Sequence, residues 1–357
     1  MKIIIATGIY PPEIGGPATY AVLVETELKK RGNIVKVLPF RVVKKYPSIV
    51  RHFLYFIKVL KMIFWADVVL AQDTVSVGLP SILASKILRK PIVIRVPGDF
   101  AWEQGVQRFK VKENIDDFQK KKYGFRVELL RSIQKFVIKK ANFVITPSNY
   151  LKNIVSNWGV KDVNLARVYN GVSIPERIFL KEFSKKTIVS SGRLVPWKGF
   201  DILINCIAKV DANLIIIGDG GDKERLEKLV RENNVSEKVS FTGSLKREEL
   251  LSYISGSNLF VLPSSFESFS FQLVEAMMLG SVVVALDAGN LKEIIKNGEN
   301  GILIDQKDID KLPEILNTLL NDKNLTKKLS ENAKEDSKKF NVDATVNELE
   351  SIFKKII

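Results

Sequence analysis

Residues 262–277 read LPSSFESFSFQLVEAM, where an apolar run ends in a polar loop and a helical pattern follows. This strand, loop and helix unit recurs in both directions from here, because short β-branched runs alternate with longer amphipathic segments along the chain. In the second half we predict strands at 187–191, 213–218, 239–242, 259–263, 282–287 and 301–304. In the first half we predict strands at 2–7, 35–39, 67–72, 91–96 and 143–146.

Apolar strands separated by helices are typical of parallel sheets that are covered on both faces. We therefore predict an α/β protein with two doubly wound domains in tandem, and 357 residues agree with roughly 100–200 residues per domain. The turn signal Asn170-Gly171-Val172, followed by a stretch without periodicity, puts the boundary after residue 174. We expect domains over 1–174 and 175–340, and a final helix over 341–357 that packs back toward the first domain.

The composition excludes several classes of chemistry. Cys206 and His52 are the one cysteine and the one histidine, so an intramolecular disulfide, a Cys/His zinc site and nearly any histidine-based triad are ruled out. The first residues lack the pattern of a secretion signal. The most apolar stretch, 52–72, is interrupted by charges and lacks the roughly 18 apolar residues of a spanning helix. We therefore expect a cytoplasmic protein that does not cross a membrane.

The positive charge is concentrated in the first half. Residues 1–174 contain 29 Lys and Arg against 12 Asp and Glu, a balance of +17, whereas the remainder contains 26 against 28. Such asymmetry indicates an anionic partner for the first half. Residues 104–140 contribute eleven of these cations, including Lys120-Lys121-Lys122. No RNA- or DNA-binding motif accompanies them, so we expect no nucleic acid.

The segment 51–64 combines cations with apolar residues. Arg51, Lys58 and Lys61 fall on one side of a predicted helix whose other sides are apolar. A basic amphipathic helix of this kind can lie on an anionic bilayer. It can equally pack on a sheet and expose a solvated basic stripe. The sequence leaves both interpretations open.

Ligands of doubly wound sheets bind at the carboxyl ends of strands, where helix N-termini present free N–H groups. The loop 8–17 follows the first strand and contains Gly15-Gly16, which permits close approach to a phosphate or simply forms a turn. A second glycine loop, 218–221, has lysine at position 223 where a dinucleotide motif needs glycine. Neither loop matches the dinucleotide pattern, and a helix start is the expected role of the second.

Two further loops carry charged residues suited to a nucleotide ligand. Arg193 and Lys198 converge on a helix start after strand 187–191, where they suit a diphosphate or form solvated surface cations. In the opening stretch, Glu267 lies on the loop and Glu275 on the helix. The two carboxylates can bind different hydroxyls of one extended ligand while the N–H groups of residues 268–270 face its phosphates. The alternative is a capping glutamate and a surface glutamate.

The order of these motifs resembles the retaining glycosyltransferases of family 4 over essentially the whole length. The motifs are Gly15-Gly16, Pro147-Ser148, Asn170-Gly171-Val172, Gly192-Arg193-Leu194 with Lys198-Gly199, the pair Glu267 and Glu275, and Gly298-Glu299-Asn300-Gly301. The resemblance implies the GT-B fold, in which two Rossmann-like domains face each other across a cleft. It also implies an acceptor-binding first domain and a donor-binding second domain.

The resemblance also implies roles for single residues. Arg193 and Lys198 would bind the donor diphosphate, Glu275 the nucleotide ribose and Glu267 the transferred sugar. The other donor-binding residues would be Gly15, Gly16, Ser268, Phe269 and Ser270, with Gly16 near the β-phosphate. Retention by front-face attack would need no covalent nucleophile, so stabilisation of the leaving diphosphate would dominate.

One position departs from the family pattern. Members commonly carry a histidine after the strand corresponding to 91–96, whereas this chain has Asp99 in the run Pro97-Gly98-Asp99. Asp99 would replace it as a catalytic residue, or it simply caps the next segment. Asp308-Ile309-Asp310 opens a predicted helix and is typical of capping, so we expect no metal and no other cofactor.

We therefore predict a retaining glycosyltransferase that uses a UDP- or GDP-sugar. The preferred acceptor is a lipid-linked or polysaccharide precursor of the cell envelope, met at the inner face of the plasma membrane by a peripheral enzyme. A soluble acceptor is one alternative. The other is a dinucleotide-dependent oxidoreductase, which would need a glycine loop to work without its third glycine.

Overall fold

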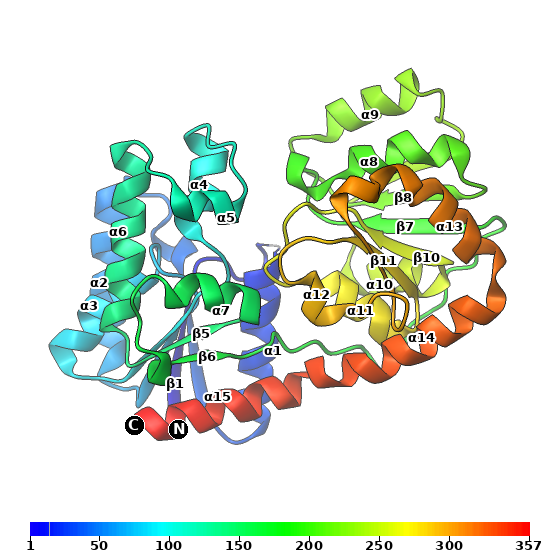
Figure 1. Cartoon of the computed structure of the whole chain (residues 1–357). Helices are drawn as coiled ribbons and strands as arrows, with labels where there is room; N and C mark the ends of the chain where they lie inside the picture. The colour runs from blue at the N-terminus through cyan, green and yellow to red at the C-terminus, as the bar shows by residue number, and fades with distance from the viewer. Residues whose placement is uncertain (14) are drawn as a thin grey trace. The chain divides into compact units, whose positions relative to one another are not determined.

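The computed structural model describes residues 1–13 and 15–357 and divides the chain into two compact units. Unit 1 comprises Met1–Gly171 and Val342–Ile357, and unit 2 comprises Val172–Asn341. Figure 1 shows the course of the chain, with labels on its helices and on most of its strands. The division lies slightly before the expected boundary after residue 174, and the last helix belongs to unit 1.

Unit 1 is built on a parallel sheet with the order β2-β1-β3-β4-β5-β6. Its strands are β1 (Lys2–Thr7), β2 (Ile34–Pro39), β3 (Val68–Ala71), β4 (Ile92–Arg95), β5 (Phe143–Thr146) and β6 (Leu165–Arg167). The first five match the predicted strands. The edge strand β6 was not predicted, because three residues with one buried side chain leave no apolar run to detect.

Seven helices connect these strands, and one more follows unit 2 in the sequence. They are α1 (Gly16–Lys30), α2 (Ser48–Ile63), α3 (Gly78–Leu88), α4 (Phe100–Arg108), α5 (Ile115–Lys120), α6 (Phe125–Lys140), α7 (Asn149–Ser156) and α15 (Val342–Ile356). Arg31, just after α1, holds α15 in unit 1 through ion pairs to Asp343 at 2.9 Å and Glu350 at 3.3 Å. None of the helices in the described part of the chain combines the length and apolarity needed to cross a membrane.

Unit 2 has a second parallel sheet with the order β12-β11-β10-β7-β8-β9. Its strands are β7 (Thr187–Ser191), β8 (Asn213–Ile217), β9 (Val239–Gly243), β10 (Leu259–Leu262), β11 (Val282–Leu286) and β12 (Ile302–Ile304). All six agree with the predicted strands to within a residue at either end. The two parallel sheets with helices between their strands confirm the predicted α/β class.

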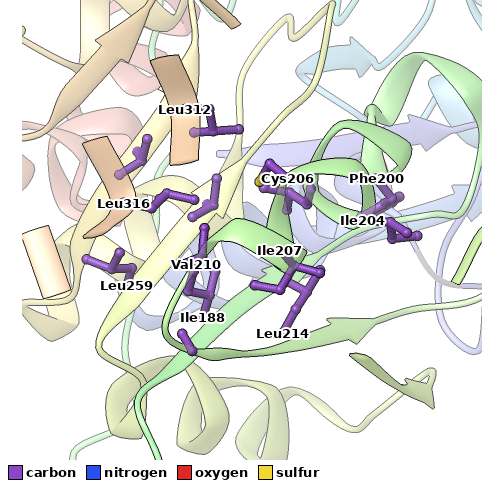
Figure 2. Packing of buried hydrophobic residues seen from close by; sticks show 14 of the residues in the cluster. Ile188, Phe200, Ile204, Cys206, Ile207, Val210, Leu214, Leu259, Leu312 and Leu316 are labelled. Atoms are coloured by element: carbon purple, nitrogen blue, oxygen red, sulfur yellow. The ribbon is translucent and has the colours of Figure 1, made fainter. Parts of the chain in front are cut away.

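The helices of unit 2 follow the same alternation. They are α8 (Phe200–Cys206), α9 (Lys223–Glu232), α10 (Arg247–Gly256), α11 (Phe271–Leu279), α12 (Leu291–Ile294), α13 (Leu312–Asn321) and α14 (Lys323–Ser337). Figure 2 shows one part of the core, where Ile188, Leu214 and Leu259 of the sheet pack with Ile204 of α8 and Leu316 of α13. This apolar packing fixes the strands, and it therefore also fixes the positions at which the loops leave their carboxyl ends.

Candidate functional site

The predicted donor residues of unit 2 follow adjacent strands of its sheet. β10 lies between β7 and β11, and all three strands run parallel. Their carboxyl ends therefore meet at one edge. The loop after β7 carries Arg193 and Lys198, and the loop after β10 carries residues 267–270. Sequence alone could indicate this edge, but not which side chains meet there.

The structure brings Lys198 and Glu267 together. The Lys198 ammonium donates to Oε1 of Glu267 in an ion pair that is mostly shielded from solvent. The two loops are tied by the backbone N–H of Ser265, which donates to the Trp197 carbonyl at 2.9 Å. Gly199 permits this approach, because a Cβ there would lie 2.1 Å from the Pro263 carbonyl oxygen. A glycine in the left-handed region is thus required beside the lysine.

Arg193 lies on the exposed side of the same loop. Its guanidinium carbon is 5.7 Å from the ring centroid of Trp197. Leu194 anchors this loop to the neighbouring loop after β8, because its N–H donates to the Asp219 carbonyl at 2.9 Å. Gly220 fits against it, because a Cβ there would lie 2.3 Å from the Leu194 oxygen. The second glycine loop therefore supports the Arg193 loop besides preceding α9.

Glu275 lies one turn inside α11 and is buried. Its Oε1 accepts two hydrogen bonds from Arg247, at 3.0 Å from Nε and 2.7 Å from Nη2. Burial raises the pKa of the Glu275 carboxyl, while the charge and hydrogen bonds of Arg247 oppose the rise. Arg247 could not be identified from the sequence, because it comes from the start of α10 and no local spacing connects it with Glu275.

The start of α11 presents backbone donors beside Glu267. Ser270 is the N-cap, and its hydroxyl accepts from the Leu273 N–H at 3.3 Å. Phe269 points into the interior, where its ring packs edge-on against Phe271 and Phe340. A donor-binding role of Phe269 would therefore come from its backbone. Ser268, which lies between Glu267 and Phe269 in the sequence, is half-buried.

Two buried polar residues at this edge were missed. Ser264 and Asn290 are almost fully buried, and their side-chain polar atoms have no hydrogen-bond partner among the described residues. The N–H of Asn290 donates to the Glu267 carbonyl at 3.3 Å, so the loop after β11 helps to fix Glu267. Buried polar atoms are costly unless something binds them. The available sequence signal was a polar residue shortly after an apolar strand, because Ser264 follows the end of β10 by two positions and Asn290 the end of β11 by four.

The remaining candidate residues belong to unit 1. Gly15 precedes α1 with φ of 151°, and a Cβ there would lie 2.9 Å from the Ile9 side chain. Gly16 is the first residue of α1, with Pro17 next to it. Both glycines thus lie at the N-terminus of a helix that follows β1, the position at which doubly wound domains bind anions. Residue 14 of this loop lies outside the described residues.

Asp99 has the capping geometry. It is the N-cap of α4, and Oδ1 accepts from the Trp102 N–H at 3.1 Å and from the Gln134 amide at 3.0 Å. Oδ2 accepts from the Gln119 amide at 2.8 Å. With 1% exposure, the carboxylate is fully engaged inside unit 1. Of the two roles left open by the sequence, the geometry favours capping.

The expected capping by Asp308 and Asp310 is not seen. Asp305 is the residue that caps the short 3₁₀ segment Gln306–Lys311, and Asp308 pairs instead with Lys311 at 2.8 Å. A capping side chain must precede the helix, and Asp308 lies inside this one. Within residues 1–13 and 15–357, no three His, Cys, Asp or Glu side chains gather as metal ligands would.

Comparisons with known proteins identify the family and the fold. The Glycosyltransferase Family 4 profile matches residues 12–175, and the Glycosyl transferases group 1 profile matches residues 176–336. An uncharacterised glycosyltransferase of Methanocaldococcus jannaschii is 32% identical over 62% of each chain. The N-acetyl-alpha-D-glucosaminyl L-malate synthase of Bacillus anthracis is 25% identical over all of this chain and 98% of its own. The chain spans 56–62% of the length of the first four curated relatives.

A solved structure shows the same fold. Anabaena HepE in complex with UDP and glucose superposes with a TM-score of 0.79, at 20% identity, over 99% of this chain and 100% of the other. The two adjoining profiles together account for most of the chain, and the two parallel sheets correspond to their two domains. The chain therefore belongs to the group 1 and family 4 glycosyltransferases and has their GT-B fold.

Proposed function

We propose that this protein transfers a sugar from a nucleotide-sugar donor to an acceptor, and that unit 2 binds the donor. The observation that carries the proposal is the meeting of Lys198 and Glu267 beside the start of α11. A cation, a carboxylate and free backbone N–H groups at one sheet edge suit a phosphate joined to a sugar. Family membership supports the same reaction.

The charges at this edge support a mechanism that stabilises the leaving group. Arg193 and Lys198 would face the diphosphate, whose negative charge grows as its bond to the sugar breaks. Lys198 is held by Glu267 before the donor binds, and the diphosphate would take over the ammonium. Glu267 would then accept from hydroxyl groups of the transferred sugar. Glu275, held in place by Arg247, would accept from the ribose hydroxyls.

We infer a retaining reaction in which the acceptor hydroxyl attacks C1 from the face that the diphosphate leaves. The bond between C1 and the phosphate oxygen breaks, and its electron pair departs with the nucleoside diphosphate. The bond between C1 and the acceptor oxygen forms, and the acceptor proton passes to the departing phosphate oxygen. Two side-chain cations and a helix N-terminus supply the positive charge, so we propose that the reaction needs no metal.

Binding and turnover of defined nucleotides test this proposal. Titration calorimetry with UDP, GDP and NAD would identify the ligand class, and release of free nucleoside diphosphate from UDP- and GDP-sugars would report turnover. We expect a nucleoside diphosphate to bind and NAD not to bind. Tight NAD binding without nucleotide-sugar turnover would instead support the dinucleotide-dependent oxidoreductase.

The acceptor is proposed to be a lipid-linked or polysaccharide precursor at the cytoplasmic face of the membrane. The balance of +17 over residues 1–174 supports an anionic acceptor or an anionic membrane near unit 1. A soluble acceptor has its own support in the L-malate named for the Bacillus anthracis relative. Membrane lipids incubated with radiolabelled donor distinguish the two. Label that enters the organic phase supports the lipid acceptor, and label transferred only to water-soluble compounds contradicts it.

A further inference from the structure

Helices α2, α3 and α6 form one layer of unit 1, as Figure 1 shows. α3 packs against both of its neighbours. In α2 the fully buried stripe consists of Tyr55, Val59 and Ile63, which are spaced four residues apart. Five more apolar residues of α2 are half-buried, so most of its apolar side chains take part in packing, whereas Ile49, Val50 and Phe53 near its start stay exposed. α2 thus packs within unit 1, as one of the two interpretations left open by the sequence expects, and it also keeps exposed apolar side chains near its start.

Large apolar side chains on this layer are exposed. We define the outer face by six of them, which come from α2 and the residue after it, from α3 and from α6: Ile49, Phe53, Phe64, Ile87, Phe125 and Phe136. Ile49 is 87% exposed, Phe125 80% and Phe53 61%. Single exposed apolar residues are ordinary in proteins, whereas several on three adjoining helices mark an interaction surface.

Positive charge predominates beside the outer face, and the one acidic residue of its three helices, Glu128 of α6, pairs with Arg131 at 2.9 Å. The sequences of α2 and α3 contain no Asp or Glu, and Lys58, Lys61 and Lys86 are exposed on them. On α6, Lys135 and Lys139 are also exposed. Exposed apolar side chains flanked by lysines are the pattern of a helix that lies in the interface of an anionic bilayer.

We propose that the outer face docks on an anionic lipid bilayer, with its apolar side chains in the interface and the lysines on lipid phosphates. A second copy of the chain fits less well. A symmetric contact would bring the same lysine-rich helices face to face, and α2 and α3 have no acidic residue to offer them. The inference deepens the proposed function by naming the surface that would meet a lipid-borne acceptor, but it rests on unit 1 alone.

The first test removes apolar surface. The double variant Phe53→Ser/Ile87→Ser changes exposed residues and is compared with Phe179→Ser/Leu180→Ser, which removes exposed apolar residues of unit 2. Full-length proteins are sedimented with vesicles of phosphatidylglycerol and phosphatidylcholine, and with phosphatidylcholine alone. At about 0.5 M salt, where charge is strongly screened, we expect the wild type and the unit 2 variant to retain binding to the anionic vesicles. The outer-face variant should lose at least tenfold in partition coefficient.

The second test reverses charge. Lys58→Glu/Lys86→Glu is compared with Lys323→Glu/Lys328→Glu, an equal change on exposed lysines of unit 2. We expect the outer-face pair to lose at least tenfold in binding to anionic vesicles at low salt, and the unit 2 pair to bind nearly as the wild type does. Equal losses in the two pairs would mean that net charge alone acts, and would overturn the assignment of the surface.

Two further outcomes would overturn the proposal. One is equal sedimentation of the wild type and Phe53→Ser/Ile87→Ser under all conditions. The other is a wild-type dimer, seen by light scattering without lipid, that the same substitutions convert to a monomer. Binding of UDP is measured on every variant and should not change. If the wild type does not bind UDP, the proposed function is contradicted, whereas the result with vesicles still stands.

Discussion

Glu267 and Glu275 are two carboxylates of one motif, each paired with a cation, and yet their surroundings differ. Glu267 lies on a loop and pairs with Lys198 from a neighbouring loop. Glu275 lies within a helix and is held by two nitrogens of Arg247 from α10. The first pair joins two loops, whereas the second joins the helices α10 and α11.

The difference indicates that the two carboxylates have different roles. A loop lysine with one contact can turn to an incoming phosphate, because its ammonium has no fixed fork geometry. A guanidinium with two hydrogen bonds to one oxygen holds a buried carboxylate in place and opposes the rise of its pKa. We therefore expect changes at the Lys198 pair to affect turnover, and changes at the Arg247 pair to affect nucleotide binding and stability.

The largest expected effect comes from removing the cations on the Glu267 side. Arg193→Ala/Lys198→Ala should lower kcat/KM at least about 10³-fold, because both side chains face the charge of the leaving group. The variant should still unfold cooperatively in denaturant, although loss of Lys198 leaves the shielded Glu267 carboxylate without its cation and lowers the free energy of unfolding. Lys292→Ala is the matched control, because it removes an exposed lysine that pairs with Asp287 near the same sheet edge. Full turnover by the double variant would refute the role.

The two carboxylates can be separated directly. Glu267→Gln should lower kcat by about 100-fold with little change in the Kd of free UDP, because the group acts on the transferred sugar. Glu275→Gln should raise the Kd of UDP about tenfold, which equals about 1.4 kcal/mol, because the amide offers one acceptor oxygen in place of the two of the carboxyl group. Titration calorimetry and steady-state kinetics measure both. Equal UDP affinity in Glu275→Gln and wild type would remove the ribose assignment.

The stability of the Arg247 pair should depend on pH. Burial raises the pKa of Glu275 and Arg247 opposes the rise, so Arg247→Ala should raise it further. A carboxyl with a raised native pKa binds more protons when folded, and its contribution to stability therefore falls as pH rises. We expect Arg247→Ala to cost about 1–3 kcal/mol at neutral pH and less in mild acid.

Denaturant unfolding across this pH range measures the effect. Adding Glu275→Gln to Arg247→Ala should restore part of the lost stability, because the neutral amide needs no cation. A loss that is the same at every pH, with no recovery in the double variant, would show that Arg247 acts through packing instead.

The smallest expected effect concerns the close approach of the loops. Gly199→Ala should lower kcat/KM about tenfold, because the added Cβ would push the Lys198 loop away from Pro263. Gly243→Ala is the control, since Gly243 also has a positive φ but has nothing within 4 Å of the added Cβ. Both substitutions share the backbone cost of about 1–2 kcal/mol. Equal kinetics of the two variants would mean that the loop contact does not position Lys198.

Much of the fold was predictable because buried parallel strands leave a continuous apolar record in the sequence. β10 and β11 are buried at every position, and their limits could be predicted closely. β6 could not, since an edge strand needs few apolar residues. For the site, Lys198 and Glu267 could be identified individually, but their contact depends on two loops that are 69 positions apart in the sequence.

The sequence by itself determined the alternation of strands and helices, the order of the motifs and the concentration of positive charge in the first half. Each of these depends on residue types at short spacing. Only the tertiary structure decided that Arg247 holds Glu275, that Asp99 caps α4, and that apolar side chains near the start of α2 stay exposed while the rest of the helix packs. These facts depend on which distant segments pack against a residue, and short-range patterns do not record such partners.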